Sequence, residues 1–220
     1  EGLAILNGRG ERLWRPLTNP RTLQTSAFID KSPRGFGLMQ RDRNFATYED
    51  LAAQFERRPS LWVEPRGNWG DGYVELIEIP SEEEIHDNVV AYWTPATPLE
   101  PGKPYPISYR LHWGTTAPLP AAGARVVRTA SGPARKDNWA RFSIDFAGPA
   151  LTESGELPAI DLTVSAGTVH NPVAQQHPAI GGVRVTFDFE TGGSEISEMR
   201  LVLKRGDATI SETWLYRWTA

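Results

Sequence analysis

The sequence predicts a mainly β protein made of many short strands. Eighteen prolines and twenty glycines interrupt the 220 residues, and such frequent turn residues favour short strands over long helices. Between them, apolar residues recur at every second position, which is the period of a strand with one buried face. Hydrophobic residues make up 40% and charged residues 23% of the chain. This balance suits a packed core and argues against disorder.

The first part of the chain, residues 1–93, is expected to hold strands and one short helix. A strand-like run begins at Leu3, and further apolar runs lie at 36–39, 61–63, 74–79 and 89–93. The helix is predicted from Thr47 to Arg57, because Thr47 can cap it and apolar side chains follow at helical spacing. We expect this part to complete a sheet whose other strands lie outside the chain.

A domain boundary is predicted at residues 94–104, which contain four prolines and a glycine and suit neither a helix nor a central strand. The expected domains are residues 1–95 and 96–220. In the second, alternating residues predict about seven strands, the number in an immunoglobulin-like β-sandwich. The strands are predicted around 107–113, 125–128, 142–146, 160–164, 183–189, 199–203 and 214–218.

Charge and hydropathy argue against two classes of partner. The net charge is -4 and no run of lysine and arginine exceeds two residues, so the chain lacks the basic surface typical of nucleic-acid binding. No run of eighteen apolar residues is present, which predicts no membrane span. Because the first six residues do not resemble a signal peptide, we expect an internal start, with the preceding portion of the same protein as a partner.

The strongest candidate for chemistry is the segment 79–93, where acidic residues directly precede an apolar strand. Burial at a strand entrance raises the pKa of a carboxyl group and keeps a proton available for a glycosidic oxygen. Asp87 suits this role best, because it lies beside Val89 and Val90. A solvated acidic loop at 82–84 is the alternative interpretation.

Tryptophan is abundant, with eight residues in the chain. Trp113, Trp214 and Trp218 lie on alternating strands and are expected in the core, since large rings bury much apolar area. Trp69 stands in a loop between glycines. It is a candidate platform for stacking a sugar, with core packing as the alternative.

Basic side chains are candidate ligands in two further places. Arg43 and Arg58 belong to a cluster of arginines and acids around the predicted helix, part of which is expected to be a surface ion-pair network. Arg135 and Trp139 lie in a loop expected at 128–139, which is longer than a hairpin needs. This loop either contacts a ligand or is mobile surface without a role.

Neither a metal nor a cofactor is expected. The four histidines, at 86, 112, 170 and 177, show no metal-ligand spacing, and the chain has no cysteine. The serines at 26, 60 and 81 lie outside any G-x-S-x-G motif, so a serine hydrolase is not indicated.

Four runs together form a specific pattern: LWRPL at 13–17, PRGFGLMQRDR at 33–43, RPSLWVEP at 58–65 and DNVVAYW at 87–93. With them the chain resembles the OpgG/OpgD (MdoG/MdoD) family. The resemblance implies a periplasmic protein of osmoregulated periplasmic glucan biosynthesis. It also implies that residues 1–95 are the C-terminal portion of a galactose-mutarotase-like β-supersandwich, followed by an immunoglobulin-like β-sandwich. A homodimer is compatible with it.

The resemblance further implies roles for individual residues. Some family members hydrolyse β-1,2-glucan and some relatives are transglycosylases, acting with inversion of the anomeric centre. Asp87 matches the family's general acid, Glu84 is a neighbour that tunes it, and the family's base lies upstream of residue 1. Arg58 is expected to hold the substrate. A non-catalytic glucan-binding or assembly factor is the alternative function, and turnover of linear β-1,2-glucan by the intact protein would separate the two.

Overall fold

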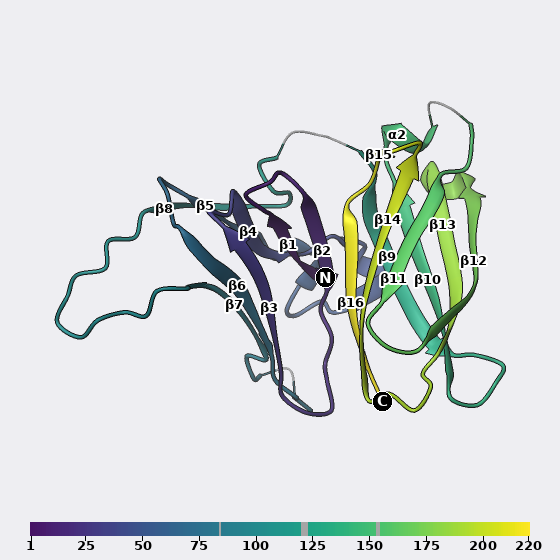
Figure 1. Cartoon of the computed structure of the whole chain (residues 1–220), viewed down its shortest axis with the longest axis horizontal. Helices are drawn as coiled ribbons and strands as arrows, with labels where there is room; N and C mark the ends of the chain where they lie inside the picture. The colour runs from purple at the N-terminus through teal and green to yellow at the C-terminus, as the bar shows by residue number, and fades with distance from the viewer. Residues whose placement is uncertain (84, 120–122, 153–154) are drawn as a thin grey trace. The chain divides into compact units, whose positions relative to one another are not determined.

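The computed structural model describes residues 1–83, 85–119, 123–152 and 155–220, so the predicted site residue Glu84 lies outside the described residues. The chain divides into two compact units, Glu1–Leu119 and Pro120–Ala220. Antiparallel strands dominate both units (Figure 1), and the predicted mainly β class is confirmed. Within the described residues, no helix has the length and apolar character needed to span a membrane.

The first unit contains two antiparallel sheets. The larger has the strand order β2-β1-β4-β5-β8, and the smaller has the order β3-β6-β7. The strands are β1 (Gly2–Leu6), β2 (Arg12–Pro16), β3 (Gln24–Lys31), β4 (Gly35–Met39), β5 (Ser60–Pro65), β6 (Asp71–Glu78), β7 (Val89–Pro95) and β8 (Tyr109–Gly114). Strand β1 matches the strand-like run from Leu3, and β4 to β7 coincide with the other apolar runs, whereas β2 and the more polar β3 were not predicted.

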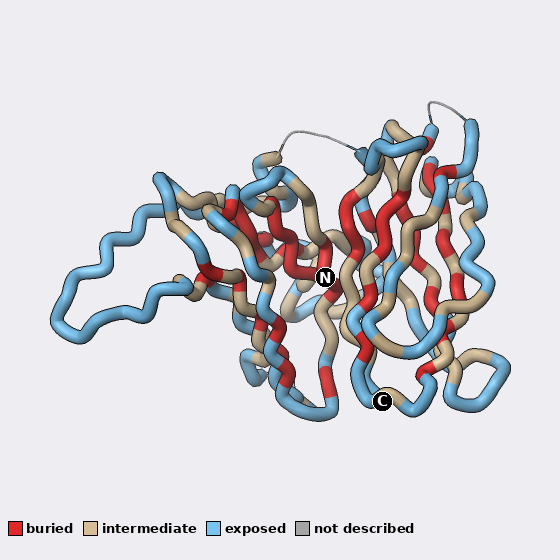
Figure 2. Tube along the Cα trace, viewed as in Figure 1, coloured by how far each residue is buried: buried red, intermediate tan, exposed pale blue. Residues whose placement is uncertain are grey.

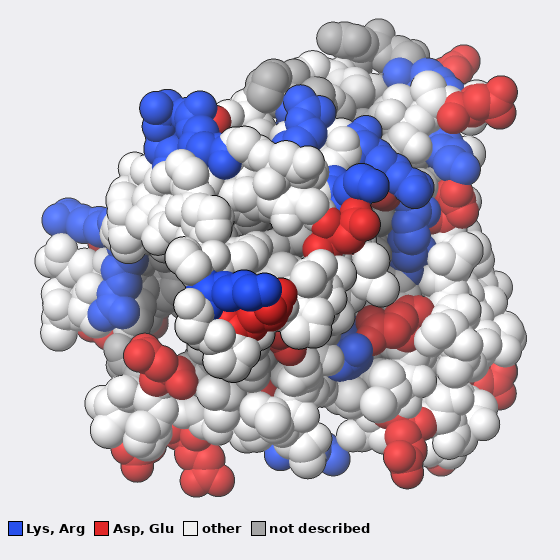
Figure 3. All heavy atoms as spheres, turned by 60° about the vertical axis from the view of Figure 1, so that its left-hand side comes forward, with Lys and Arg blue, Asp and Glu red and all other residues white. Residues whose placement is uncertain are grey.

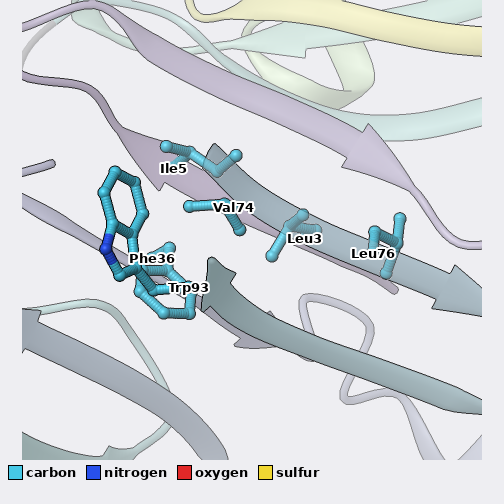
Figure 4. Packing of buried hydrophobic residues seen from close by; sticks show 6 residues of the cluster. All are labelled: Leu3, Ile5, Phe36, Val74, Leu76 and Trp93. Carbon is cyan, nitrogen blue, oxygen red and sulfur yellow. The ribbon is translucent and has the colours of Figure 1, made fainter. Parts of the chain in front are cut away.

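A hydrophobic cluster joins these two sheets. Strands β1 and β4 contribute from one sheet, and β6 and β7 contribute from the other (Figure 4). The six buried members are Leu3, Ile5, Phe36, Val74, Leu76 and Trp93. Alternation along β6 explains its share, because every second residue from Gly72 to Glu78 is buried, as the period of a strand requires.

Two strand glycines of this unit each lie beneath a tryptophan ring. A methyl group at Gly2 would stand 2.4 Å from the Trp14 ring, and one at Gly35 would stand 2.3 Å from the Trp62 ring. Both rings are buried. The glycines therefore leave the space that lets two large indoles lie flat on neighbouring strands.

The predicted helix from Thr47 to Arg57 is wrong. The segment forms only α1 (Phe45–Tyr48) and a 3₁₀ turn η1 (Phe55–Arg57). Glu49 and Gln54 adopt positive φ angles of 53° and 50°, which interrupt a right-handed helix. In addition, the Asp50 carboxylate accepts hydrogen bonds from the backbone N–H groups of Ala52 and Ala53, so this acid competes with helical pairing.

The expected boundary at residue 95 differs from the observed division after residue 119. The proline-rich segment is the exposed connection between β7 and β8, and it extends away from the strands (Figure 2). Strand β8 then pairs with β5, with Trp113 opposite Leu61. The strand predicted at 107–113 thus belongs to the first unit. Trp113, expected in the core, is 65% exposed, and that expectation is wrong for the described residues.

The second unit also contains two antiparallel sheets. One has the order β12-β13-β10-β9, and the other has the order β11-β14-β16 with β15 beside β14. The strands are β9 (Arg125–Pro133), β10 (Trp139–Ala147), β11 (Ala159–Val164), β12 (Thr168–His177), β13 (Gly182–Glu190), β14 (Ile196–Arg205), β15 (Ala208–Thr209) and β16 (Thr213–Thr219); the helical turns are α2 (Pro149–Thr152) and η2 (Pro178–Ile180). Six strands predicted for the sandwich lie here.

Aromatic side chains fill the space between these two sheets. Phe142 and Phe187 stack at 5.0 Å, and both meet the ring of Trp214 edge to face, at 6.1 and 6.3 Å. Trp214 is fully buried, as the sequence predicts. Because Phe142 and Phe187 come from one sheet and Trp214 from the other, these contacts fix the sheets face to face.

Two features of the second unit differ from expectation. Strand β9 continues to Pro133, so the loop expected at 128–139 shrinks to five residues, 134–138, an ordinary hairpin length. Strand β12 was not predicted because its alternation breaks at a register shift between His170 and Val173, where Asn171 has a φ of 50°. A bulge of this kind disrupts the two-residue period.

Candidate functional site

A groove in the first unit brings together two residues that the sequence singled out. It encloses about 480 Å³, and both Asp87 and Arg58 line it. Arg58 follows the turn η1, and Asp87 precedes strand β7. The remaining lining comes from Asn19, Phe55, Ser81, Glu82, Glu83, His86, Asn88 and Val89.

The Asp87 side of the groove is anchored by a buried ion pair. Arg15 of β2 and Glu78 of β6 are 2.9 Å apart and 2% and 0% exposed. The other Glu78 oxygen accepts hydrogen bonds from the backbone N–H and the hydroxyl of Thr18, at 2.6 and 2.9 Å. Glu78 is therefore paired on both carboxylate oxygens, which is what burial of a charge demands.

Hydrogen bonds extend this anchor into the acidic loop. The Asn19 side chain donates to the Ser81 carbonyl at 2.7 Å and accepts from the Ser81 N–H at 3.1 Å. At the base of the loop, the Ile79 N–H donates to the Asn88 carbonyl at 2.7 Å. Two fixed points thus hold the loop that presents Asp87.

The Arg58 side of the groove is held by Arg43. The Arg43 guanidinium donates to the backbone carbonyls of Glu56 and Arg58, at 3.0 and 2.8 Å, and to the Ser60 hydroxyl at 3.2 Å. Arg43 was predicted to bind substrate, but these bonds commit its Nη atoms to the protein backbone and to Ser60. The geometry therefore supports a positioning role for Arg43, which holds the backbone that carries Arg58.

Asp87 and Arg58 are themselves available to a ligand. Both are exposed, and within the described ranges neither side chain makes a hydrogen bond or an ion pair; the Arg58 guanidinium only lies over the Phe55 ring, 4.2 Å from its centre. The burial of Asp87 that the sequence suggested is absent from this part of the protein.

Trp69 lies against the core of the first unit. Its ring centre is 6.4 Å from Phe36 and 6.0 Å from Trp93, and its indole N–H donates to the Ser108 carbonyl at 3.0 Å. Trp69 does not line the groove that holds Asp87. The contacts favour the packing alternative over a sugar platform.

Arg135 and Trp139 line a separate hollow of about 500 Å³ in the second unit. The Trp139 ring stacks on His170, with centres 4.3 Å apart, and the Lys136 Nζ lies 4.1 Å from the Trp139 ring centre. Because a stacked ring and a cation at these distances need opposite faces, both faces of Trp139 are occupied. Nearby, the Arg141 guanidinium hydrogen-bonded to Asp188 lowers the pKa of that carboxyl. This charged surface does not offer Trp139 as a stacking platform.

Glu78 and Arg15 are the residues of the site that sequence reasoning missed. The signal was present, because Glu78 occupies the inward position of β6 after Val74 and Leu76. A carboxylate on the buried face of a strand requires a cation or several donors. Arg15 lies in the buried end of β2, where Trp14, Arg15 and Pro16 are all buried, so only Glu78 could have been suspected from alternation.

The electrostatics of the molecule agree with its composition. Figure 3 shows one face, on which basic and acidic side chains are interspersed. Among the residues that the structure describes, no group of three His, Asp or Glu side chains converges as a metal site would require.

Comparison with known proteins identifies the family. A family model described as "Periplasmic glucan biosynthesis protein, MdoG" matches residues 1–218. A protein named "Glucans biosynthesis protein G" from Rhodopseudomonas palustris is 51% identical over 221 residues, which cover 100% of this chain and 44% of that protein. Proteins of the same name from Vibrio cholerae and Bradyrhizobium diazoefficiens are 50% and 47% identical, again over 100% of this chain and over 41% and 44% of their own lengths.

The chain therefore spans about two-fifths of the length of these relatives. The sequence motifs at 13–17, 33–43, 58–65 and 87–93 fall within the matched region. The chain belongs to the MdoG family of periplasmic glucan biosynthesis proteins.

Proposed function

We propose that the whole protein acts on β-1,2-glucan during periplasmic glucan biosynthesis, as an inverting hydrolase or transglycosylase. The proposal includes a periplasmic location, which the family description supports. The observation that carries it is the groove lined by Asp87 and Arg58, whose charged groups are both unpaired within the described residues. An unpaired acid and an unpaired donor in one groove suit a substrate rich in hydroxyl groups.

In this proposal Asp87 protonates the oxygen of the scissile glycosidic bond, and the Arg58 guanidinium donates hydrogen bonds to sugar hydroxyls. The base that activates the nucleophile belongs to the portion of the protein outside this chain. In inverting enzymes the two carboxyl groups stand about 6.5–9.5 Å apart, which leaves room for the attacking group. A sugar that fills the groove excludes water from the Asp87 carboxyl group.

A non-catalytic glucan-binding role is the second candidate. The exposure of Asp87 favours it, because no described residue shields a proton transfer at this carboxyl group from water. The same groove would then hold a glucan without cleaving it.

Turnover of linear β-1,2-glucan by the whole protein tests the proposal. Hydrolysis with inversion should yield shorter chains whose new reducing ends first appear as the α anomer, followed by NMR before mutarotation. Transglycosylation should change chain lengths without a net increase in reducing ends. If the glucan binds but its chain lengths stay unchanged, the catalytic proposal is wrong and the binding role is favoured.

Replacing Arg43 by lysine is expected to weaken substrate binding without altering chemistry. A lysine cannot donate simultaneously to the Glu56 and Arg58 carbonyls in the planar geometry of arginine, so Arg58 loses its fixed position. We expect KM to rise by about fivefold to tenfold and kcat to change less than about twofold, since the loss concerns ground-state binding.

Arg57→Lys is the matched control, because Arg57 directly precedes Arg58 in the chain and its side chain is 74% exposed. It should leave both kinetic constants unchanged. A fall in kcat with constant KM for Arg43→Lys would contradict the positioning role.

A further inference from the structure

A second hollow lies at one open end of the second unit, apart from the groove that holds Asp87. It encloses about 630 Å³, within the range of ~300–1,000 Å³ in which proteins bind small ligands. Its lining comes from the end of β9, the start of β10, the turn between β13 and β14, and the end of β16. All these residues belong to one compact unit.

The apolar wall of this hollow continues the aromatic core. Trp214, Tyr216 and Trp218 occupy every second position of β16, so they point to the same side of the strand. Trp214 is buried, whereas Trp218 is only partly buried and has Phe189 as its aromatic neighbour, 5.4 Å away. Trp139 also lines the hollow. Trp218, the last of these three aromatic side chains, is therefore left at the open end of the sandwich.

The rim is polar and almost uncharged. Ser131, Asn138 and Ser194 line it, and within the described ranges none of their side chains has a hydrogen-bond partner in the protein. Glu195 contributes the one acidic side chain of this described lining, and no lysine or arginine belongs to it. The absence of basic side chains from these described residues argues against an anionic ligand, and the polar rim argues against a wholly apolar one.

The turn that carries Ser194 is already fixed. The Thr191 N–H donates to the Asn138 carbonyl at 3.3 Å, and the Ser194 N–H donates to the Thr191 carbonyl at 3.0 Å. Gly193 has a φ of 81°, and a methyl group placed there would meet no atom within 4 Å. A preformed rim facing open space reduces the entropy lost when a ligand binds.

We propose that this hollow is a sugar-binding site, in which a neutral glucan chain packs the C–H face of one ring against Trp218. The hydroxyl groups of that ring then exchange hydrogen bonds with Ser131, Asn138 and Ser194. The site binds glucan without cleaving it. It gives the protein a second place to hold glucan, besides the groove that contains Asp87. It does not depend on turnover at Asp87.

The test uses the whole protein carrying Asp87→Asn, labelled with 5-fluorotryptophan, so that the probe is not consumed. A linear β-1,2-linked glucose trisaccharide is titrated, and the ¹⁹F resonance of Trp218 is assigned with Trp218→Phe. The Trp218 resonance should shift saturably, with a Kd on the order of 1 mM, as is usual for a small ligand held by a few contacts. Maltotriose in a parallel titration shows whether the linkage matters.

Ser194→Phe, which fills the hollow without removing a core contact, should raise this Kd at least about tenfold. Asn138→Gly keeps the positive φ of 62° and removes only the amide, and it should raise the Kd severalfold. Val173→Phe adds a ring at an exposed position of β12 that does not line the hollow and should leave the Kd unchanged.

A Trp218 resonance that does not move with either sugar would overturn the proposal, as would an equal shift in the Ser194→Phe protein. Failure of the catalytic proposal is distinguishable, because the protein without Asp87→Asn would then leave β-1,2-glucan chains intact while the Trp218 resonance still responds.

Discussion

The Asp87→Asn variant of the whole protein is expected to turn over β-1,2-glucan about 10²–10⁴-fold more slowly, the usual contribution of a general acid. Asparagine keeps the shape of aspartate but has no acidic proton to give to the leaving oxygen. Because Asp87 is exposed and makes no hydrogen bond within the described residues, the substitution should leave the melting temperature and the affinity for glucan nearly unchanged. Initial rates on linear β-1,2-glucan, together with a binding titration, measure these effects.

Glu82→Gln is the matched control for this substitution. Glu82 lines the same groove and is also exposed, so it undergoes the same loss of one negative charge. We expect its turnover to stay within about twofold of the unsubstituted protein, since Glu82 takes no part in the proposed proton transfer. Retention of more than half the activity by Asp87→Asn, or equal losses in the two variants, would remove Asp87 from the mechanism.

The Glu78→Gln variant is expected to lose about 3–5 kcal/mol in the free energy of unfolding, because it removes the acidic member of a buried ion pair. The amide can still accept hydrogen bonds from Thr18, but it cannot neutralise a cation that is 2% exposed. Urea denaturation followed by tryptophan fluorescence measures this loss. Since Glu78 precedes the loop of Asp87, glucan turnover should fall as well.

Asp71→Asn provides the comparison at the other end of the same strand. Its ion pair with Lys31 spans 3.5 Å between side chains that are 65% and 79% exposed, and exposed pairs contribute about 0–1 kcal/mol. A loss below about 1 kcal/mol for Glu78→Gln would contradict the stabilising role of this ion pair. The double variant Arg15→Met/Glu78→Leu should recover part of the loss, since it buries no unpaired charge.

The sequence predicts strands well where apolar residues alternate without interruption. Phe142, Ile144 and Phe146 are all buried in β10, and so are Val183, Val185, Phe187 and Phe189 in β13. The prediction fails where the position of a strand depends on which distant strand it pairs with. Nothing local to residues 109–114 shows that they hydrogen-bond to β5, some fifty residues earlier in the chain, whereas the proline-rich segment before them has the composition of a domain boundary.

The candidate site was predictable only in part, for a similar reason. Asp87 followed from an acid placed before a strand, and its company with Arg58 followed from the family resemblance. The supporting contacts join distant segments, as in the hydrogen bonds from Asn19 to Ser81 and from Arg43 to the carbonyl of Arg58. Side-chain hydrogen bonds to backbone carbonyls leave no pattern in the sequence, because every residue carries the same backbone acceptor whatever its side chain.

The tryptophan rings that lie on Gly2 and Gly35 have a consequence for how sequences of this family vary. Positions 2 and 14 share one volume, and so do positions 35 and 62, so a side chain can be gained at the glycine only if the ring is lost at its partner. The two positions of each pair should therefore covary among relatives. Gly35→Ala and Trp62→Leu should each destabilise the protein alone but do so less than additively together. Each glycine and its tryptophan are thus expected to change together or not at all.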